Sequence, residues 1–344
     1  MSSPAPTRRR VIVTDVGQVS TAVEPVPEPA PDEALVTMVI AGVCGSDLHA
    51  LAGKHPLMVP PFHPGHEVVG IVQEVGADVT DITPGQRVIP EPTLPCGHCK
   101  MCRTGRSNIC ENLQFFGCGF REGGMADSFT IRADRLHVVP EEFSDEQAVL
   151  IEPLATPVHA VRNAGGVEGK AVVITGCGTI GLLVLAAARA GGARRIVMTD
   201  PLEAKRDVAL RSGADAVIDA TTPDLPAAVK AELGETADVV FDCVSIEPTV
   251  AAAVDMVERG GTVVMVGVPA GSFPVPAFTL QDKQIRLQGT ATYTAEDYRE
   301  SIRILRDLPD AGATMVTAQY PLDDAAAAFD AARSGAEIKV AIRP

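Results

Sequence analysis

Hydrophobic positions follow two different patterns along the chain, and the change falls near residue 155. Before it, short β-branched runs such as 34–40 and 68–72 are separated by turns rich in glycine and aspartate, which is typical of β-strands. The proline-rich connection from Pro25 to Pro31 excludes a helix there. After it, apolar runs alternate with alanine-rich helical segments, which predicts a doubly wound parallel sheet. The runs that we expect to form its strands are 171–175, 195–199, 215–219, 237–242, 262–267 and 285–288.

The end of the chain returns to a mixed pattern, which predicts a helix over 295–306 and a terminal strand over 338–342. We therefore expect an α/β fold in which one domain interrupts another. An irregular β-rich domain spans 1–155, a Rossmann-type domain spans 156–290, and residues 291–344 return to the first domain.

The first strand of the predicted parallel sheet ends in Gly-x-Gly-x-x-Gly, at Gly176, Gly178 and Gly181. Thr179 and Ile180 complete this turn, which leads into a helix whose first backbone N–H groups can hold a pyrophosphate. The next apolar run ends at Asp200, about 20 residues beyond the last glycine, where a carboxylate accepts from a ribose hydroxyl. Strand, turn, helix and acid together predict a dinucleotide site. Asp200 favours NAD, whereas Lys205 and Arg206 leave NADP open.

The bulk composition excludes several classes of partner. A net charge of −15 and the absence of tryptophan argue against nucleic acid and against an anionic membrane surface. The segment 171–188 carries no formal charge, but it contains the glycine turn, so we interpret it as a buried strand and helix and not as a membrane span. No apolar signal follows Arg8, Arg9 and Arg10, which we expect to begin a solvated strand in a cytoplasmic protein.

Four of the eight cysteines fall within 15 residues, at positions 96, 99, 102 and 110. Four thiolates so close together can surround a zinc ion completely, which would make the metal structural. An iron–sulfur cluster is the competing interpretation, but the last spacing is longer than in bacterial ferredoxins and no proline follows Cys110. The sequence therefore predicts a structural zinc lobe over 94–112.

A second set of polar residues is scattered over the β-rich part. Cys44, His66 and Glu152 form a mixed set of thiol, imidazole and carboxylate, which suits a catalytic zinc with one open position. Taken singly, each has an ordinary explanation as a buried thiol, a loop histidine or a carboxylate at a helix start. Only their combination favours a metal site.

The order of these motifs resembles the zinc-dependent medium-chain dehydrogenases, in the alcohol and polyol dehydrogenase group close to sorbitol and threonine dehydrogenases. The resemblance covers nearly the whole chain and implies a GroES-like catalytic domain beside the Rossmann domain. The motifs that carry it are the segments 42–49, 64–67, 96–110, 123–127, 152–154, 176–181 and 338–340.

The resemblance also implies roles for individual residues. Cys44 and His66 become ligands of a catalytic zinc, with Glu152 favoured over Glu67 as the third ligand and both kept open. Ser46 and His49 match the positions that relay the alcohol proton to solvent, although His49 also fits a plain surface histidine. In this family a cation at the position of Lys339 lies near the cofactor phosphates, and Asp47 supports the ligands from behind. A homodimer or homotetramer is expected.

The reaction expected from this resemblance is hydride transfer between a secondary alcohol or polyol, or its ketone, and NAD(H). Two alternatives remain at this stage: a zinc-free reductase of activated double bonds, and a non-catalytic scaffold with the same fold. Phe115 and Phe116 resemble the polyol branch, and so does Tyr293, but Thr292 stands where polyol enzymes usually have an arginine. Arg121 is a candidate partner for an anionic group of the substrate.

Overall fold

The computed structural model describes residues 5–55 and 58–344, and the chain forms two compact units. The first unit comprises Met1–Glu152 and Leu305–Pro344, and the second comprises Pro153–Ile304. Helix α10 (Ala295–Arg306) therefore lies mainly in the second unit. Helix α4 (Ile151–Asn163) begins at the end of the first unit and continues in the second.

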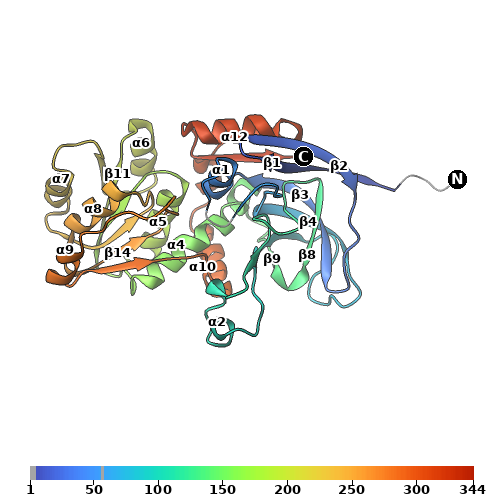
Figure 1. Ribbon diagram of the computed structural model, residues 1–344, viewed down its shortest axis with the longest axis horizontal. Coiled ribbons are helices and arrows are strands. Elements are labelled where there is room, and N and C mark those ends of the chain that lie inside the picture. Colours follow the sequence, from blue (N-terminus) through green and yellow to red (C-terminus); the bar gives the residue numbers. More distant parts are fainter. Residues whose placement is uncertain (1–4, 56–57) are drawn as a thin grey trace. The chain divides into compact units, whose positions relative to one another are not determined.

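The second unit, in which Figure 1 labels β11 and β14, is built on a six-stranded parallel sheet. The order of its strands is β12-β11-β10-β13-β14-β15. Its strands are β10 (Ala171–Thr175), β11 (Arg195–Asp200), β12 (Ala216–Asp219), β13 (Ala237–Asp242), β14 (Val257–Met265) and β15 (Arg286–Gly289). Its remaining helices are α5 (Thr179–Ala190), α6 (Glu203–Arg211), α7 (Leu225–Leu233), α8 (Glu247–Met256) and α9 (Ala277–Asp282). The predicted doubly wound sheet is confirmed. Strand order reverses between β10 and β13, where ligands bind in such folds.

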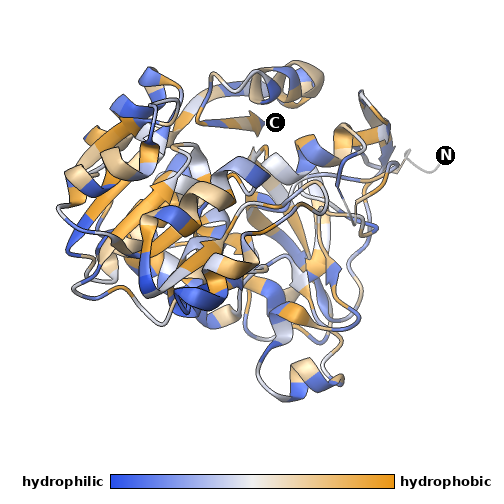
Figure 2. Cartoon of the chain, turned by 60° about the vertical axis from the view of Figure 1, so that its left-hand side comes forward, coloured by the Kyte–Doolittle hydropathy of each residue, from blue (hydrophilic) through white to orange (hydrophobic). Residues whose placement is uncertain are grey.

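The strands of this sheet are apolar because helices or neighbouring chain cover them. Val173, Val197, Val240 and Val263 are all fully buried in one core cluster, and Figure 2 shows the strands in the colours of hydrophobic residues. Helix α5, which follows the glycine turn, buries Leu182 and most of its other apolar side chains. The uncharged stretch 171–188 is thus a buried strand and helix, and no helix in the described residues is long and apolar enough to cross a membrane.

The first unit contains a seven-stranded sheet, of which Figure 1 labels β3, β4, β8 and β9. The order is β16-β17-β3-β4-β5-β9, and β8 pairs with β3. These strands are β3 (Glu33–Gly42), β4 (Glu67–Val75), β5 (Arg87–Pro90), β8 (Ser128–Arg132), β9 (Leu136–Val138), β16 (Val316–Pro321) and β17 (Lys339–Arg343). Two smaller pairs are β1 (Thr7–Asp15) with β2 (Gln18–Pro25), and β6 (Thr93–Leu94) with β7 (Gln114–Phe115). The helices are α1 (Gly45–Leu51), α2 (Lys100–Arg103), α3 (Asp145–Ala148), α11 (Ala311–Met315) and α12 (Ala325–Ser334), with short 3-10 turns η1 (Ser107–Ile109), η2 (Ala133–Arg135) and η3 (Leu322–Asp324).

The last strand closes the first unit. β17 pairs antiparallel with the end of β3, with Ala341 opposite Gly42, and Val43 donates its N–H to the carbonyl of Val340 at 2.9 Å. This pairing brings residue 339 next to the segment that follows β3, although almost 300 residues separate the two in the chain.

The expectation that the three N-terminal arginines are solvated is wrong for two of them. Arg8 and Arg10 are 3% and 5% exposed, and Arg8 forms two 3.0 Å hydrogen bonds to the buried carboxylate of Glu122. Both also pair with Glu24 on β2. Alternation along β1 turns these two side chains to the same side, where the carboxylates compensate their charge.

Candidate active site and metal centres

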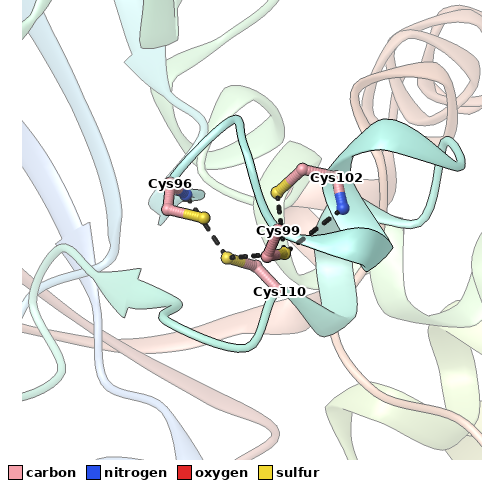
Figure 3. Close-up of side chains that lie close together, drawn as sticks. All are labelled: Cys96, Cys99, Cys102 and Cys110. Carbon is pink, nitrogen blue, oxygen red and sulfur yellow. Dashed lines mark hydrogen bonds between the residues drawn. The ribbon is translucent and has the colours of Figure 1, made fainter.

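The four lobe cysteines converge on one point, between β6, α2 and β7 (Figure 3). Their sulfur atoms all lie within 4.8 Å of one another, with Cys99 Sγ 3.5 Å from Cys102 Sγ and 3.8 Å from Cys110 Sγ. Zinc–sulfur bonds of about 2.3 Å place the corners of a tetrahedron about 3.8 Å apart. All eight cysteines of the chain are free thiols. The donor set therefore fits a closed zinc site, as the spacing predicted.

A second cluster joins three residues from two places in the first unit. Sγ of Cys44, a ring nitrogen of His66 and a carboxylate oxygen of Glu67 lie within 4.8 Å of one another. Cys44 is the N-cap residue of α1, and Glu67 begins β4, so the start of a helix and the start of a strand hold the set. Thiol, imidazole and carboxylate are the donors of a catalytic zinc, so this cluster fits the expected metal.

Glu67 has a strong partner in the same place. Lys339 Nζ lies 2.8 and 2.6 Å from the two carboxylate oxygens and also donates to the carbonyl of Val43 at 3.2 Å. Both side chains are almost fully buried. Burial opposes the charge of Lys339, but Glu67 raises the pKa of that ammonium above its usual value. Gly42 leaves room for the pair, because a Cβ there would stand 2.1 Å from Glu67 Oε2.

This pairing gives Lys339 a role that sequence reasoning did not find. The resemblance places a cation near the cofactor phosphates, whereas here the ammonium neutralises Glu67 inside the first unit. The phosphate contact remains a prediction. No local pattern near residue 339 could have identified Glu67, since the partners are 272 residues apart.

Glu152 is buried, with 5% exposure, in the first turn of α4. In the described part of the chain it does not belong to the close cluster of Cys44, His66 and Glu67. Its charge nevertheless contributes to raising the pKa of Lys339, so the two groups share one electrostatic environment.

The other side of His66 faces a second group of residues. Its Nδ1 lies 3.2 Å from Cys118 Sγ and 3.8 Å from Asp47 Oδ1, and the edge of its ring meets Phe115 with the centroids 5.7 Å apart. Asp47 is fully buried and accepts the Cys44 N–H at 3.1 Å. Burial raises the pKa of Asp47 to about 6 and that of Cys118 to about 11. Sequence reasoning named Asp47 but missed Cys118, whose only signal was a thiol between two glycines.

The two residues expected to relay protons both lie on α1, directly after Cys44. Ser46 is half-buried and His49 is exposed, so the helix leads from the buried cluster towards solvent.

The candidate cofactor loop lies in the second unit, between β10 and α5. Gly176 has φ of +91°, and Gly181 approaches so closely that a Cβ would stand 1.8 Å from the Gly176 carbonyl oxygen. Gly178 is the N-cap of α5, and apart from its two chain neighbours no described residue has an atom within 4 Å of where its Cβ would be. Gly178 is therefore free of packing demands from the protein. Thr179 and Ile180 follow it as the first residues of α5. This open start of a helix suits an anion.

Asp200 ends β11 and is only 7% exposed. One oxygen accepts the Cys177 N–H at 2.8 Å and the other accepts the Leu202 N–H at 2.9 Å. The carboxylate thus fixes the glycine turn and keeps further lone pairs for a ligand hydroxyl. Arg206 donates to the carbonyls of Asp200 and Pro201, which ties its guanidinium to the backbone.

Two further residues from the sequence analysis have structural partners. Arg121, the candidate partner of an anionic substrate group, pairs with Glu33 and lies over the ring of Phe120 at 5.6 Å. Tyr293 is buried in the second unit, with its ring centroid 5.8 Å from that of Tyr298.

Comparisons with known proteins match the whole chain. A family model described as "Alcohol dehydrogenase GroES-like domain" matches residues 30–141, and one described as "Zinc-binding dehydrogenase" matches residues 179–307. Sorbitol dehydrogenase of Ovis aries is 30% identical over an alignment of 347 positions, which covers 99% of this chain and 98% of that protein.

Two solved dehydrogenase structures are similar to this chain over nearly its whole length. L-idonate 5-dehydrogenase of Escherichia coli has a TM-score of 0.90 at 28% identity and covers 98% of this chain and 99% of its own. A Sinorhizobium meliloti 1021 protein described as a zinc-binding dehydrogenase, bound to NADP, has a TM-score of 0.91 at 30% identity and covers 98% of this chain and 100% of its own.

Proposed function

The chain belongs to the zinc-dependent medium-chain alcohol and polyol dehydrogenases, and we propose that its substrate is a polyol or another secondary alcohol, oxidised to the ketone with NAD as hydride acceptor. The observation that carries the proposal is the mixed cluster of Cys44, His66 and Glu67, present together with the intact glycine loop. Relatives that act on sorbitol and L-idonate support a polyhydroxylated substrate.

Cys44, His66 and one carboxylate would hold the catalytic zinc, and the four lobe cysteines would hold the structural zinc. A bound zinc acts as a Lewis acid that lowers the pKa of an alcohol. Ser46 would accept the hydroxyl proton while it gives up its own, and His49, on the exposed side of α1, would pass the relayed proton to solvent. Asp200 accepts from a ribose hydroxyl, and the backbone of 178–181 holds the pyrophosphate.

For the third ligand we propose Glu152, with Glu67 beside it. Support comes from the ion pair of Glu67: Lys339 engages both of its carboxylate oxygens and neutralises its charge. A zinc ion replacing that contact would leave the buried ammonium of Lys339 unpaired, which is costly. Comparing the zinc content of Glu67→Gln and Glu152→Gln tests this choice, because only the loss of a true ligand should empty the site.

We propose NAD as the physiological cofactor. The Asp200 carboxylate would repel a 2′-phosphate, and Arg206, one of the two cations in the first turns of α6, is held by backbone carbonyls. A relative crystallised with NADP makes the comparison of both cofactors necessary. Equal kcat/KM for NAD and NADP would contradict this assignment.

The test of the function is the initial rate of NADH formation by zinc-loaded protein with polyols, diols, simple secondary alcohols and β-hydroxy acids. We expect a clear preference within the polyols and diols. The matched control is Cys44→Ser, which should abolish turnover and reduce the zinc content from two ions per chain to one. Turnover that survives in Cys44→Ser would remove this cluster from the reaction. A zinc-free parent with reductase activity on activated double bonds would point to the other reaction of this superfamily.

We also propose a homodimer or homotetramer located in the cytoplasm. Family resemblance supports the assembly, and the need to keep all lobe thiols reduced supports the compartment. Sedimentation at several protein concentrations tests the assembly, and a monomer under all conditions would refute it.

A further inference from the structure

His66 is contacted by a thiol that the family resemblance does not explain. Cys118 Sγ lies 3.2 Å from His66 Nδ1, a normal distance for a hydrogen bond to sulfur. The carboxylate oxygen nearest to the same ring nitrogen, Asp47 Oδ1, is 3.8 Å away, which is too far for a hydrogen bond. The thiol is therefore the closer acceptor.

Asp47 is a second buried polar group beside the His66 ring, independent of Cys118. Its side chain is fully buried, and Oδ1 has no hydrogen-bond partner among the described residues. Its other oxygen is held by the Cys44 N–H. Donor atoms of Asp47, His66 and Cys118 all lie within 4.8 Å of one another, so the orphaned oxygen points into the same small space as the thiol.

The backbone also fixes the position of this thiol. Gly117 has φ of +73°, and a Cβ there would stand 2.6 Å from the backbone nitrogen of His66. Cys118 N–H donates to the carbonyl of Phe115 at 3.1 Å, and Gly117 N–H donates to that of Glu122 at 2.9 Å. The loop that carries Cys118 thus packs directly against the backbone of His66, which leaves the Cys118 side chain little freedom.

We propose that Cys118 is a positioning residue for the metal ligand His66: its sulfur accepts the Nδ1 proton and thereby turns Nε2 towards Cys44. Histidine ligands in metal sites donate their second N–H to a partner that fixes the ring and the tautomer, and this partner is commonly a carboxylate or a carbonyl. In this chain a thiol takes that place, while Asp47 stands further off. The inference rests on the proposed zinc site at Cys44 and His66.

The test compares Cys118→Ser, which keeps an acceptor, with Cys118→Ala, which removes it. Zinc release from the full-length holoenzyme to a chromophoric chelator is followed, and the lobe zinc serves as an internal reference. We expect Cys118→Ala to weaken zinc binding at the His66 site about 10- to 100-fold, and Cys118→Ser to restore most of it. Cys118→Val, which fills the volume without an acceptor, should behave as Cys118→Ala, and it replaces that variant if the alanine form does not fold.

Equal zinc retention in the serine, alanine and valine forms would overturn the proposal. Cobalt at the His66 site gives a second readout, since thiolate ligands produce intense charge-transfer absorption. We expect Cys118→Ser to leave this absorption unchanged, because only Cys44 is a thiolate ligand. A loss of about half of it would identify Cys118 as a ligand and also overturn the positioning role. If the unsubstituted protein binds only the lobe zinc, the proposed zinc site at Cys44 and His66 is refuted. This result is measured without any substitution, so it is distinct from a failure of the role of Cys118.

Discussion

Replacing Gly117 by alanine should empty the catalytic zinc site while leaving the lobe zinc in place. The new Cβ would stand 2.6 Å from the His66 nitrogen and 2.7 Å from the Gly65 carbonyl carbon, both backbone atoms that cannot rotate away. Ordinary contact begins at 3.4 Å, so the loop and the His66 backbone must separate by about 0.8 Å. Metal–ligand distances tolerate only about 0.2 Å, so His66 would no longer bind zinc together with Cys44.

The chain offers a matched control two residues away. Gly119 also has a positive φ, +83° against +73°, but apart from its two chain neighbours no described residue has an atom within 4 Å of its Cβ position. Alanine at either site suffers the strain of the left-handed backbone region, about 1–2 kcal/mol. Only Gly117→Ala adds the clash, so the difference between the two variants isolates the contact with His66.

The assay is zinc per chain by atomic emission, measured after dialysis, together with thermal unfolding. We expect Gly119→Ala to keep two zinc ions per chain and to lose some stability. Gly117→Ala should keep one zinc ion and lose more stability than its control. If both variants keep two ions with equal affinity, the close approach of this loop does not position His66, and the reasoning is refuted.

Three further predictions concern charge and metal. Lys339→Met should destabilise the zinc-free first unit by about 3–5 kcal/mol, because Glu67 keeps a buried, uncompensated charge; chemical denaturation checks this, and a neutral effect would contradict it. Burial opposes the shift, but hydrogen bonds from His159 and Thr294 lower the pKa of Asp297 below the usual value of 3.8. The ionised carboxylate therefore stabilises the fold above pH 3.8, and this stabilisation is lost as the pH falls through the lower pKa of the folded protein. Asp297→Asn should therefore cost more stability at pH 7 than at pH 3, and a constant difference would contradict the linkage. Cys110→Ser should remove the lobe zinc and lower the melting temperature of the protein. Calorimetry should still detect NAD binding by this variant, because the glycine loop lies in the second unit.

Much of the fold could be predicted because its determinants are local. Strand and helix alternate between 171 and 289 with a period that the sequence displays directly, and the predicted strands agree with the observed ones to within a few residues, except that β14 begins at Val257. Gly176 and Gly181 could be identified because the turn and the close packing they permit are properties of a few neighbouring residues. The same holds for the four lobe cysteines, whose short connections leave them few ways to arrange around a metal.

Contacts between distant segments had no such signal. Cys118 and His66 are 52 residues apart, Arg8 and Glu122 are 114 apart, and only the folded sheet brings each pair together. For Arg8 and Arg10 the sequence predicted exposed side chains, and this prediction is wrong. The exposure of a strand residue depends on which distant segments of the chain cover it.

The sequence by itself determined the class of fold, the glycine loop and the four-cysteine lobe, since these depend on residue types at short spacing. The tertiary structure decided which carboxylate lies beside Cys44 and His66, and that Lys339 neutralises it from the last strand. It also decided that a thiol stands behind the imidazole. Burial and long-range pairing fix these features, and both exist only once β17 and the 115–125 loop have packed against the segments that carry the ligands.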